Sequence, residues 1–247
     1  MSQLKNLLNI PPEDLDYVVN AVGSNWEGLR HGRLLLTGGT GFVGKWLLAT
    51  FLHANQVHDL RASIVIVSRD PISFLEKFPE LKNLSNIEWV HSDVRKFELG
   101  ELESCNFCIH AATDVEKMAT PSNTLTTAIS GTQQILRAMT PANEKYRLLL
   151  VSSGAVYGDV DSTNSPIKES WGGAPSISSP SAAYGEGKRI SELLCTLAAD
   201  THPKLEISIA RCFAFVGPHL PLDKHFAIGN FISDAMQKKD IKIEGDG

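Results

Sequence analysis

The chain has 247 residues, of which 43% are hydrophobic, and a formal net charge of −5 at pH 7. This length and composition allow one large core, or a core with a smaller lobe, and they exclude a disordered chain. No basic run interleaved with aromatic residues is present, so we expect no nucleic-acid partner. The first fifteen residues lack the apolar segment of a signal peptide, and no long apolar stretch follows. We therefore expect no membrane partner and a cytoplasmic location.

Residues 1–32 precede the first predicted strand and are predicted to form a helical extension. Two prolines followed by acidic residues at 11–14 are typical of a helix start. We expect this extension to pack on the sheet edge or on a partner subunit, and we expect a homodimer.

Strand-like and helix-like segments then alternate along the chain. Strands are predicted at 33–37, 62–68, 87–91, 106–111, 147–152 and 206–211, and helices at 42–54, 122–139 and 182–200. Because the strands are too continuously apolar to have a solvated face, the pattern predicts an α/β fold with a doubly wound parallel sheet. Ligands of such sheets bind at the carboxyl ends of the strands. Residues 158–184, rich in Ser, Pro and Gly, are predicted to form a long loop of the kind that often binds or covers a ligand.

The segment RLLLTGGTGFVGKWLL, residues 33–48, places glycines where the first strand turns into a helix. Gly39, Gly41 and Gly44 have the spacing G-x-G-x-x-G, and Gly38 extends it to G-x-x-G-x-x-G. Glycine permits a tight turn, and the N–H groups at the start of a helix favour an anion. The segment therefore predicts a binding site for the pyrophosphate of a dinucleotide.

Ser68 and Arg69 stand at the end of the second predicted strand, where the choice of cofactor is usually made. An NAD site has a carboxylate there for the ribose 2′-hydroxyl, whereas a 2′-phosphate requires a cation. Asp70 comes two residues late, and a guanidinium can both bind phosphate and stack on adenine. The sequence therefore favours NADP(H) as the cofactor. In the alternative interpretation Arg69 is an ordinary surface residue, and NAD(H) remains possible.

Two further segments carry residues suited to acid–base chemistry. Ser152 and Ser153 end a predicted strand, and Tyr184 and Lys188 lie one helical turn apart on the same face of a helix. A nearby ammonium stabilises the ionised form of a tyrosine. Ser153 would then polarise a carbonyl while Tyr184 gives or takes its proton.

Cys105 and Cys108 have the C-x-x-C spacing of a redox or zinc pair. Cys108, however, belongs to the apolar run FCIHAA, and no second pair completes a zinc site. We interpret both cysteines as core residues and expect no metal site.

The motifs TGGTGFVG, HSDV, IHAAT, SSGAVYG, YGEGK and RCFAFVGP occur in this order. Together they resemble the extended short-chain dehydrogenase/reductase superfamily, specifically the NAD(P)-dependent epimerase/dehydratase family that modifies nucleotide sugars. The resemblance covers about residue 33 to the end. It implies a Rossmann NAD(P)-binding domain at 33–211 and, at 212–247, the start of a smaller substrate-binding lobe that looks incomplete beside such relatives.

The resemblance also implies roles for individual residues. The catalytic residues would be Ser153, Tyr184 and Lys188, with Ser153 preferred to Ser152 because it lies four residues before Tyr157. The cofactor-binding residues would be Gly38, Gly41, Phe42, Val43, Gly44, Ser68, Arg69, Asp93, Val94, Ala111, Ala112, Thr113, Tyr184, Lys188, Cys212 and Phe213. The substrate-binding residues would be Ser153, Ala214 and Asn230.

Departures from the family pattern bear on the reaction. Dehydratases of the family carry acidic residues directly after the catalytic Ser or Thr, whereas this chain has Gly154 and Ala155. Ala128 and Ala214 also replace asparagines that many relatives have. We therefore expect hydride transfer at a carbon of a nucleoside-diphosphate sugar, and slightly favour reduction of a 4-keto-deoxysugar over epimerisation. A dihydroflavonol-reductase-like enzyme acting on a small non-sugar carbonyl and a non-enzymatic NADP(H)-binding regulator are the alternatives.

Overall fold

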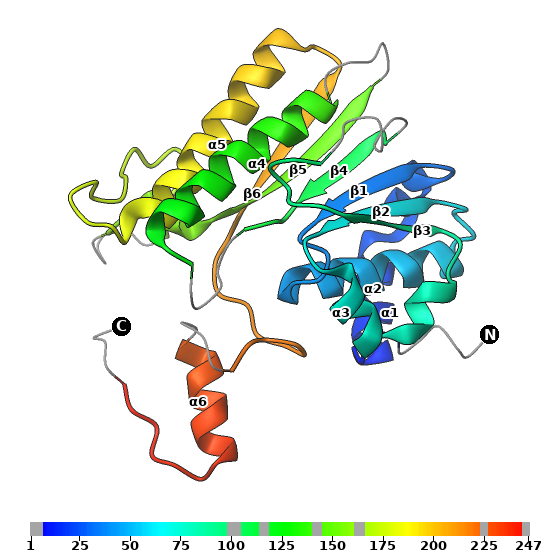
Figure 1. The fold of residues 1–247 in the computed structure, drawn as a ribbon, viewed down its shortest axis with the longest axis horizontal. Helices are drawn as coiled ribbons and strands as arrows, with labels where there is room; N and C mark the ends of the chain where they lie inside the picture. Colours follow the sequence, from blue (N-terminus) through cyan, green and yellow to red (C-terminus); the bar gives the residue numbers. More distant parts are fainter. Residues whose placement is uncertain are drawn as a thin grey trace.

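A six-stranded parallel sheet with the strand order β3-β2-β1-β4-β5-β6 forms the centre of the protein (Figure 1). The computed structural model describes residues 7–97, 105–113, 119–139, 145–160, 166–222 and 227–243. Its strands are β1 (Arg33–Thr37), β2 (Ser63–Ser68), β3 (Ile87–His91), β4 (Phe107–His110), β5 (Tyr146–Ser153) and β6 (Leu205–Cys212). The predicted strands are therefore confirmed, with bounds that differ by no more than one residue at either end.

The apolar strands are buried on both faces of the sheet, as the doubly wound fold requires. Leu34 and Leu36 of β1 point to one face and join a core cluster with Leu48 and Phe51. Leu35 points to the opposite face, where it packs in a second cluster with Ile135. Alternate side chains of one strand thus serve two separate cores, which explains why the strand shows no polar alternation.

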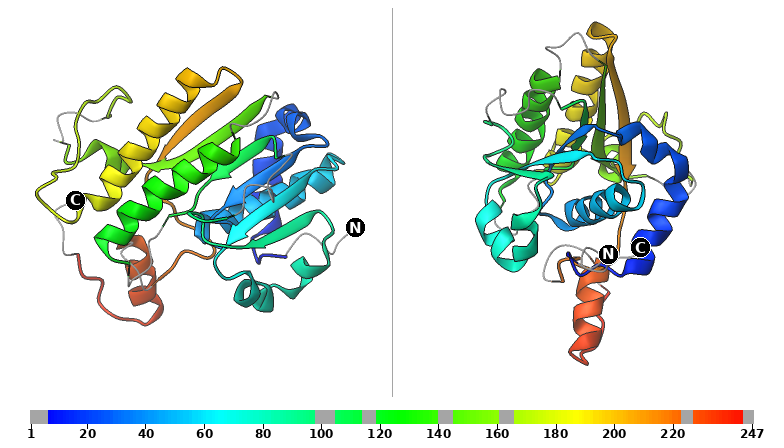
Figure 2. Two further views of the ribbon diagram at one scale, coloured as in Figure 1. Left: turned by 45° about the horizontal axis from the view of Figure 1, so that its top comes forward. Right: turned by 90° about the vertical axis from the view of Figure 1, so that its right-hand side faces the viewer.

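Helices cover the two faces of the sheet separately (Figures 1 and 2). On one side lie α1 (Pro12–Val22), the 3₁₀ helix η1 (Gly23–Leu29) and α2 (Phe42–Val57), and on the other α4 (Pro121–Met139) packs against α5 (Ala182–Thr201). Short elements, α3 (Pro71–Lys77) and η2 (Pro79–Asn83), connect β2 to β3. This arrangement is a Rossmann-type α/β fold. The sequence analysis did not predict α3, although Asp70 caps its first turn by accepting a hydrogen bond from the backbone N–H of Ser73 at 3.0 Å.

The segment that follows β6 runs beneath α2 and reaches the N-terminal residues. Trp46 Nε1 of α2 donates to the carbonyl of Pro218 at 3.0 Å, and His219 Nε2 lies 2.5 Å from the carbonyl oxygen of Leu8. These contacts fix the segment beside the carboxyl ends of the strands. Beyond it, α6 (Ala227–Met236) extends away from the sheet (Figures 1 and 2), and Gly229 is its only buried residue.

The described part of the predicted long loop, residues 158–160 and 166–181, packs against α5 and the end of β6. Arg189 Nη1 donates to the carbonyl of Gly173 at 2.9 Å, and Arg211 Nη1 donates to the carbonyl of Glu169 at 2.8 Å. Gly158 has a φ of +69° and approaches the backbone of Ala174 so closely that an added Cβ would lie 2.2 Å from its carbonyl oxygen. The loop is therefore fixed to α5, which it precedes, and to β6. None of the helices in the described ranges has the length and apolar character needed to span a membrane.

Candidate functional site

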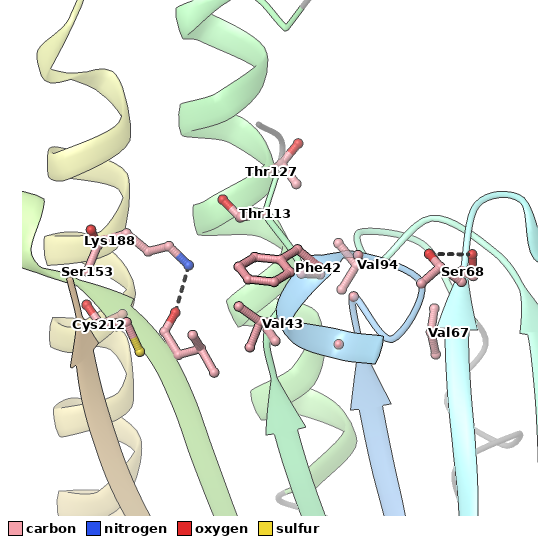
Figure 3. Close-up of a pocket in the computed structure, with 18 of the residues that line it drawn as sticks. Phe42, Val43, Val67, Ser68, Val94, Thr113, Thr127, Ser153, Lys188 and Cys212 are labelled. Carbon is pink, nitrogen blue, oxygen red and sulfur yellow. Dashed lines mark hydrogen bonds between the residues drawn. The ribbon is translucent and has the colours of Figure 1, made fainter. Parts of the chain in front are cut away.

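A cavity of about 630 Å³ lies at the carboxyl ends of the strands, where β1 stands between β2 and β4 (Figure 3). The strand order reverses here, which is the usual ligand site of an open α/β sheet. The cavity is lined by all the residues predicted to bind the cofactor, and by Ser153 and Ala214. Asn230 is not among the lining residues and lies exposed on α6.

The cavity also has lining residues that sequence reasoning missed, namely Thr40, Val67, Asp70, Ser92, Thr127, Val151, Ser152, Phe215 and Leu220. Several of them, including Val67 and Val151, lie at the end of a strand whose position was predicted. Thr127, in the middle of α4, and Leu220 carry no motif, and only the packing of distant segments brings them to the cavity.

Gly38 and Gly44 are required by the packing of the turn itself. Gly38 has a φ of +73°, and an added Cβ would lie 2.8 Å from the backbone of Ala111 and Ala112. A Cβ on Gly44 would lie 2.0 Å from the carbonyl oxygen of Gly38. These two glycines bring β1, α2 and the end of β4 together.

Gly41 is different, because the protein leaves room beside it. It precedes α2 with φ −76° and ψ −178°, a conformation open to any residue. An added Cβ would meet only the carbonyl oxygen of Gly38, at 3.3 Å. Gly41 lines the cavity, so the space that its missing side chain leaves is available to a ligand at the start of α2.

Thr113 supplies a second sign that this cavity binds a polar group. Its hydroxyl oxygen is buried yet has no hydrogen-bond partner within the described parts of the chain. Buried polar atoms in proteins are nearly always hydrogen-bonded. The turn with room at Gly41 and the hydroxyl of Thr113 therefore fit a pyrophosphate-bridged dinucleotide with adjoining sugars.

The end of the cavity near β2 contains both carboxylates and a cation. Asp70 is used in capping α3, and Asp93 forms a two-point ion pair with Arg95, with distances of 2.7 and 2.8 Å. The hydrogen bond from Arg95 lowers the pKa of Asp93, and the charge of Arg69 lowers it further. Arg69 lines the cavity at the position predicted for the 2′-substituent.

At the opposite end, the ends of β5 and β6 meet the first turns of α5 (Figure 3). Lys188 is buried, and its Nζ donates to the carbonyl of Val151 at 2.8 Å. Ser152 is also buried, and its hydroxyl donates to the Glu192 carboxylate at 2.5 Å. The Ser153 hydroxyl instead accepts the backbone N–H of Ala155 at 3.1 Å. Because the Ser152 hydroxyl is already hydrogen-bonded to Glu192, the Ser153 hydroxyl is the better placed of the two to bind a ligand.

Burial changes the ionisation of the groups around this end. It lowers the pKa of Lys188 to about 8, although Cys212 and Glu192 act in the opposite direction. Burial, with the charge of Lys188, lowers the pKa of His110 to about 3. His110 is therefore neutral, and its Nδ1 lies 2.7 Å from the Thr37 hydroxyl, which also accepts the backbone N–H of Ala112 at 3.1 Å. This histidine fixes the strand ends instead of exchanging protons.

Cys105 and Cys108 are both buried free thiols. Burial raises the pKa of Cys105 to about 11 and that of Cys108 well above its usual value. Such thiols are poor nucleophiles and poor metal ligands, as expected for core residues.

Fold and site together define a Rossmann-type protein in which the residues predicted to bind a dinucleotide line one cavity with Ser153, Tyr184 and Lys188. A model of the NAD dependent epimerase/dehydratase family matches residues 34–247, so the chain belongs to this family.

Individual relatives modify nucleotide sugars. The chain is 28% identical over 222 residues to UDP-glucuronic acid decarboxylase 1 of Arabidopsis thaliana, covering 89% of this chain and 48% of that protein. The match to UDP-glucuronic acid decarboxylase 1 of Xenopus tropicalis is also 28% identical, covering 87% of this chain and 48% of the relative. The chain thus spans about half the length of these curated relatives.

Solved structures show the same fold. A dTDP-glucose 4,6-dehydratase from Streptomyces venezuelae, with NAD bound, is similar with a TM-score of 0.68 and 26% identity, covering 87% of this chain and 65% of that chain. A UDP-N-acetylglucosamine 4-epimerase from Methanobrevibacter ruminantium is similar with a TM-score of 0.72 and 24% identity. The match covers 88% of this chain and 67% of the epimerase chain.

Proposed function

We propose that the protein is an NADP(H)-dependent enzyme that transfers hydride at a carbon of a nucleoside-diphosphate sugar. The observation that supports this most strongly is that Ser153, Tyr184 and Lys188 line the same cavity as the glycine turn. The nucleotide-sugar enzymes to which the chain is similar support the substrate class.

Each of the three residues has a separate task in this proposal. When bound, the dinucleotide supplies or accepts the hydride. A carbonyl carbon that gains hydride leaves negative charge on its oxygen, so a proton and a hydrogen-bond donor are needed there. Tyr184 donates the proton in reduction and accepts it in oxidation. Ser153 donates a hydrogen bond to the same oxygen, and the Lys188 ammonium binds the cofactor ribose and stabilises an ionised tyrosine.

Within this class, reduction of a 4-keto-deoxysugar is our preferred reaction. Gly154 and Ala155 place no acid or base directly after Ser153, which argues against elimination of water. A reductase must also release its oxidised cofactor in every turnover. The described part of the long loop contributes no lining residue to the cavity, and so does not enclose a bound cofactor.

Product analysis tests this function. The protein is incubated with NADPH and dTDP-4-keto-6-deoxyglucose, and both NADPH consumption and the configuration of the product are measured. Stoichiometric consumption supports reduction, whereas conversion of UDP-glucose to its 4-epimer in a parallel incubation with NADP⁺ or NAD⁺, without net reduction of the cofactor, indicates epimerisation. If no nucleotide sugar raises the melting temperature in the presence of NADPH, while a small aldehyde or ketone is reduced, the nucleotide-sugar proposal is wrong.

Decarboxylation of UDP-glucuronic acid is a second candidate, favoured by the similarity to UDP-glucuronic acid decarboxylases. Oxidation at carbon 4 of such a sugar produces a β-keto acid, which loses CO₂ readily, and the same Tyr184 would accept the proton. Release of CO₂ from UDP-glucuronic acid, with NAD⁺ or NADP⁺ present, would identify this reaction.

Arg69→Ala tests the cofactor preference. We expect wild-type protein to bind NADPH more tightly than NADH, and the variant to lose most of that preference, by about 1–3 kcal/mol, because a charged hydrogen bond to the 2′-phosphate is lost. Fluorescence titration with both cofactors measures the difference. Arg95→Ala is the matched control: Arg95 pairs with Asp93 and does not line the cavity, so both affinities should change alike. Equal affinities of wild-type protein for the two cofactors would contradict the proposal.

The pH dependence of cofactor binding tests Lys188. Its pKa is about 8, so the ammonium is present below that pH and is lost above it. We therefore expect NADPH affinity to fall as the pH rises through about 8, with His110 neutral throughout this range. Lys188→Met should bind more weakly and show no such decline, and Lys188→Arg should keep its affinity to higher pH. An affinity that is constant from pH 7 to pH 10 in wild-type protein, within about twofold, would exclude this role.

A further inference from the structure

Glu192 is a mostly buried carboxylate that lies one helical turn after Lys188 on α5. Its side chain is 12% exposed, and Glu192 is not among the residues that line the cavity. Residues four apart on a helix lie on the same face, so the two side chains leave α5 in the same direction. A ligand in the cavity would touch Lys188 but not Glu192.

The two side chains contact neighbouring residues of β5. Lys188 Nζ donates to the carbonyl of Val151 at 2.8 Å (Figure 3), and the Ser152 hydroxyl donates to Glu192 at 2.5 Å. Because Val151 and Ser152 are adjacent in the strand, the ammonium and the carboxylate are held near each other at the end of β5.

Arg211 of β6 holds the Glu192 carboxylate in place. Its guanidinium donates to both carboxylate oxygens, with distances of 2.7 and 3.0 Å. A buried charge is stable in a protein only when it has such a partner, and the planar guanidinium also sets the orientation of the carboxylate. The pair therefore fixes a negative charge behind β5, next to Lys188.

The groups that face Lys188 are His110 of β4, Cys212 of β6, and Tyr184 and Glu192 of its own helix. Burial lowers the pKa of Lys188 to about 8, whereas Cys212 and Glu192 raise it. Burial also raises the pKa of the Cys212 thiol, so this thiol is uncharged at neutral pH. His110 is neutral as well, because burial lowers its pKa to about 3. Of these groups, Glu192 therefore supplies the negative charge that stabilises the ammonium.

We propose that Glu192 is a positioning residue that acts through Lys188, keeping its ammonium charged at neutral pH from outside the cavity. The inference rests on the proposed function, in which that ammonium binds the cofactor ribose. Removal of the Glu192 charge would leave Arg211 as an unpaired cation in the same region, so Lys188 would lose its proton at a lower pH. The carboxylate thus extends the pH range in which the cofactor is bound.

The pH profile of NADPH binding tests this role. Dissociation constants are measured by fluorescence titration from about pH 5.5 to about pH 10, with wild-type protein and with Glu192→Gln, which keeps the size of the side chain. We expect the decline in affinity to occur about one pH unit lower in the variant. The variant should then bind NADPH about fivefold more weakly at about pH 8, and as tightly as wild-type protein at about pH 5.5.

Glu186→Gln is the matched control, because Glu186 lies on the same helix but pairs with Arg189, at 3.6 Å; its profile should be that of wild-type protein. Arg211→Met should move the decline to a higher pH, because the charge of Glu192 is then no longer offset. In a Lys188→Met background, Glu192→Gln should leave the profile unchanged, since the ammonium that it stabilises is absent. Melting temperatures verify that each variant is folded.

A loss of NADPH affinity by the same factor at every pH in Glu192→Gln would indicate a merely structural role and overturn the proposal. An unchanged profile in folded Glu192→Gln, or shifts in the same direction in Glu192→Gln and Arg211→Met, would also overturn it. If Glu192→Gln does not fold, the direction of the shift in Arg211→Met decides. If wild-type affinity does not depend on pH, the role of Lys188 in the proposed function fails first, and that of Glu192 fails with it.

Discussion

Replacing Gly41 by Val should abolish cofactor binding while the protein still unfolds cooperatively near the wild-type temperature. The backbone conformation of Gly41 is open to any residue, and an added Cβ meets only the carbonyl oxygen of Gly38, at 3.3 Å. The branched side chain would instead fill the space at the start of α2 where we propose that the pyrophosphate of the cofactor binds. Titration with NADPH and thermal unfolding of the same samples measure both properties.

Gly44→Ala is the control that separates binding from folding. A Cβ at that position would lie 2.0 Å from the Gly38 carbonyl oxygen, so this variant should lose about 1–3 kcal/mol of stability through overpacking. Gly41→Val should be much less affected in stability. Unchanged NADPH affinity in folded Gly41→Val would show that the turn serves only to join β1 to α2.

The strands of the sheet could be predicted closely because each strand is indicated by a run of residues adjacent in the sequence. Leu34, Leu35 and Leu36 form a continuous apolar run since alternate residues enter two different cores, and such a run between turn residues indicates a buried parallel strand. The glycine turn was equally predictable, because its glycine spacing lies within seven residues of sequence and Gly44 is required by a contact inside the turn, with the carbonyl oxygen of Gly38. Both patterns lie within short stretches of the sequence, although the close approach of Gly38 to Ala111 does not.

Other parts of the site depend on contacts between distant segments. The hydrogen bond from Ser152 to Glu192 connects residues forty positions apart in the sequence. The contact between the Phe213 ring and Gly154 brings together the ends of β6 and β5. No pattern of neighbouring residues in the sequence predicts either contact. The long loop illustrates the same limit: its composition indicated a loop, but its position is set by hydrogen bonds from Arg189 of α5 and Arg211 of β6.

Replacing Tyr184 by Phe should leave cofactor affinity unchanged and reduce turnover by roughly 10²-fold or more, the usual contribution of a positioned acid. The change removes one hydroxyl from a residue that lines the cavity with Ser153 and Lys188. Without that hydroxyl, the oxygen that becomes negative during hydride transfer has no proton donor. Turnover is measured as NADPH consumption with a 4-keto nucleotide sugar or, if the protein epimerises, as conversion of a 4-hydroxy nucleotide sugar to its 4-epimer with oxidised cofactor.

Two serine variants distinguish loss of the chemistry from general damage to the site. Ser153→Ala should lose a factor of about 10²–10³ in turnover, because it removes one donor to the developing oxyanion. Ser152→Ala removes a buried hydroxyl that is hydrogen-bonded to the partly buried Glu192 carboxylate, so it should chiefly lower stability, by about 1–3 kcal/mol. The two effects should be separable, since the hydroxyls belong to neighbouring residues but have different partners. If Tyr184→Phe turned over at the wild-type rate, or if Ser152→Ala rather than Ser153→Ala lost turnover without loss of stability, the assignment of the acid and the oxyanion donor would be wrong.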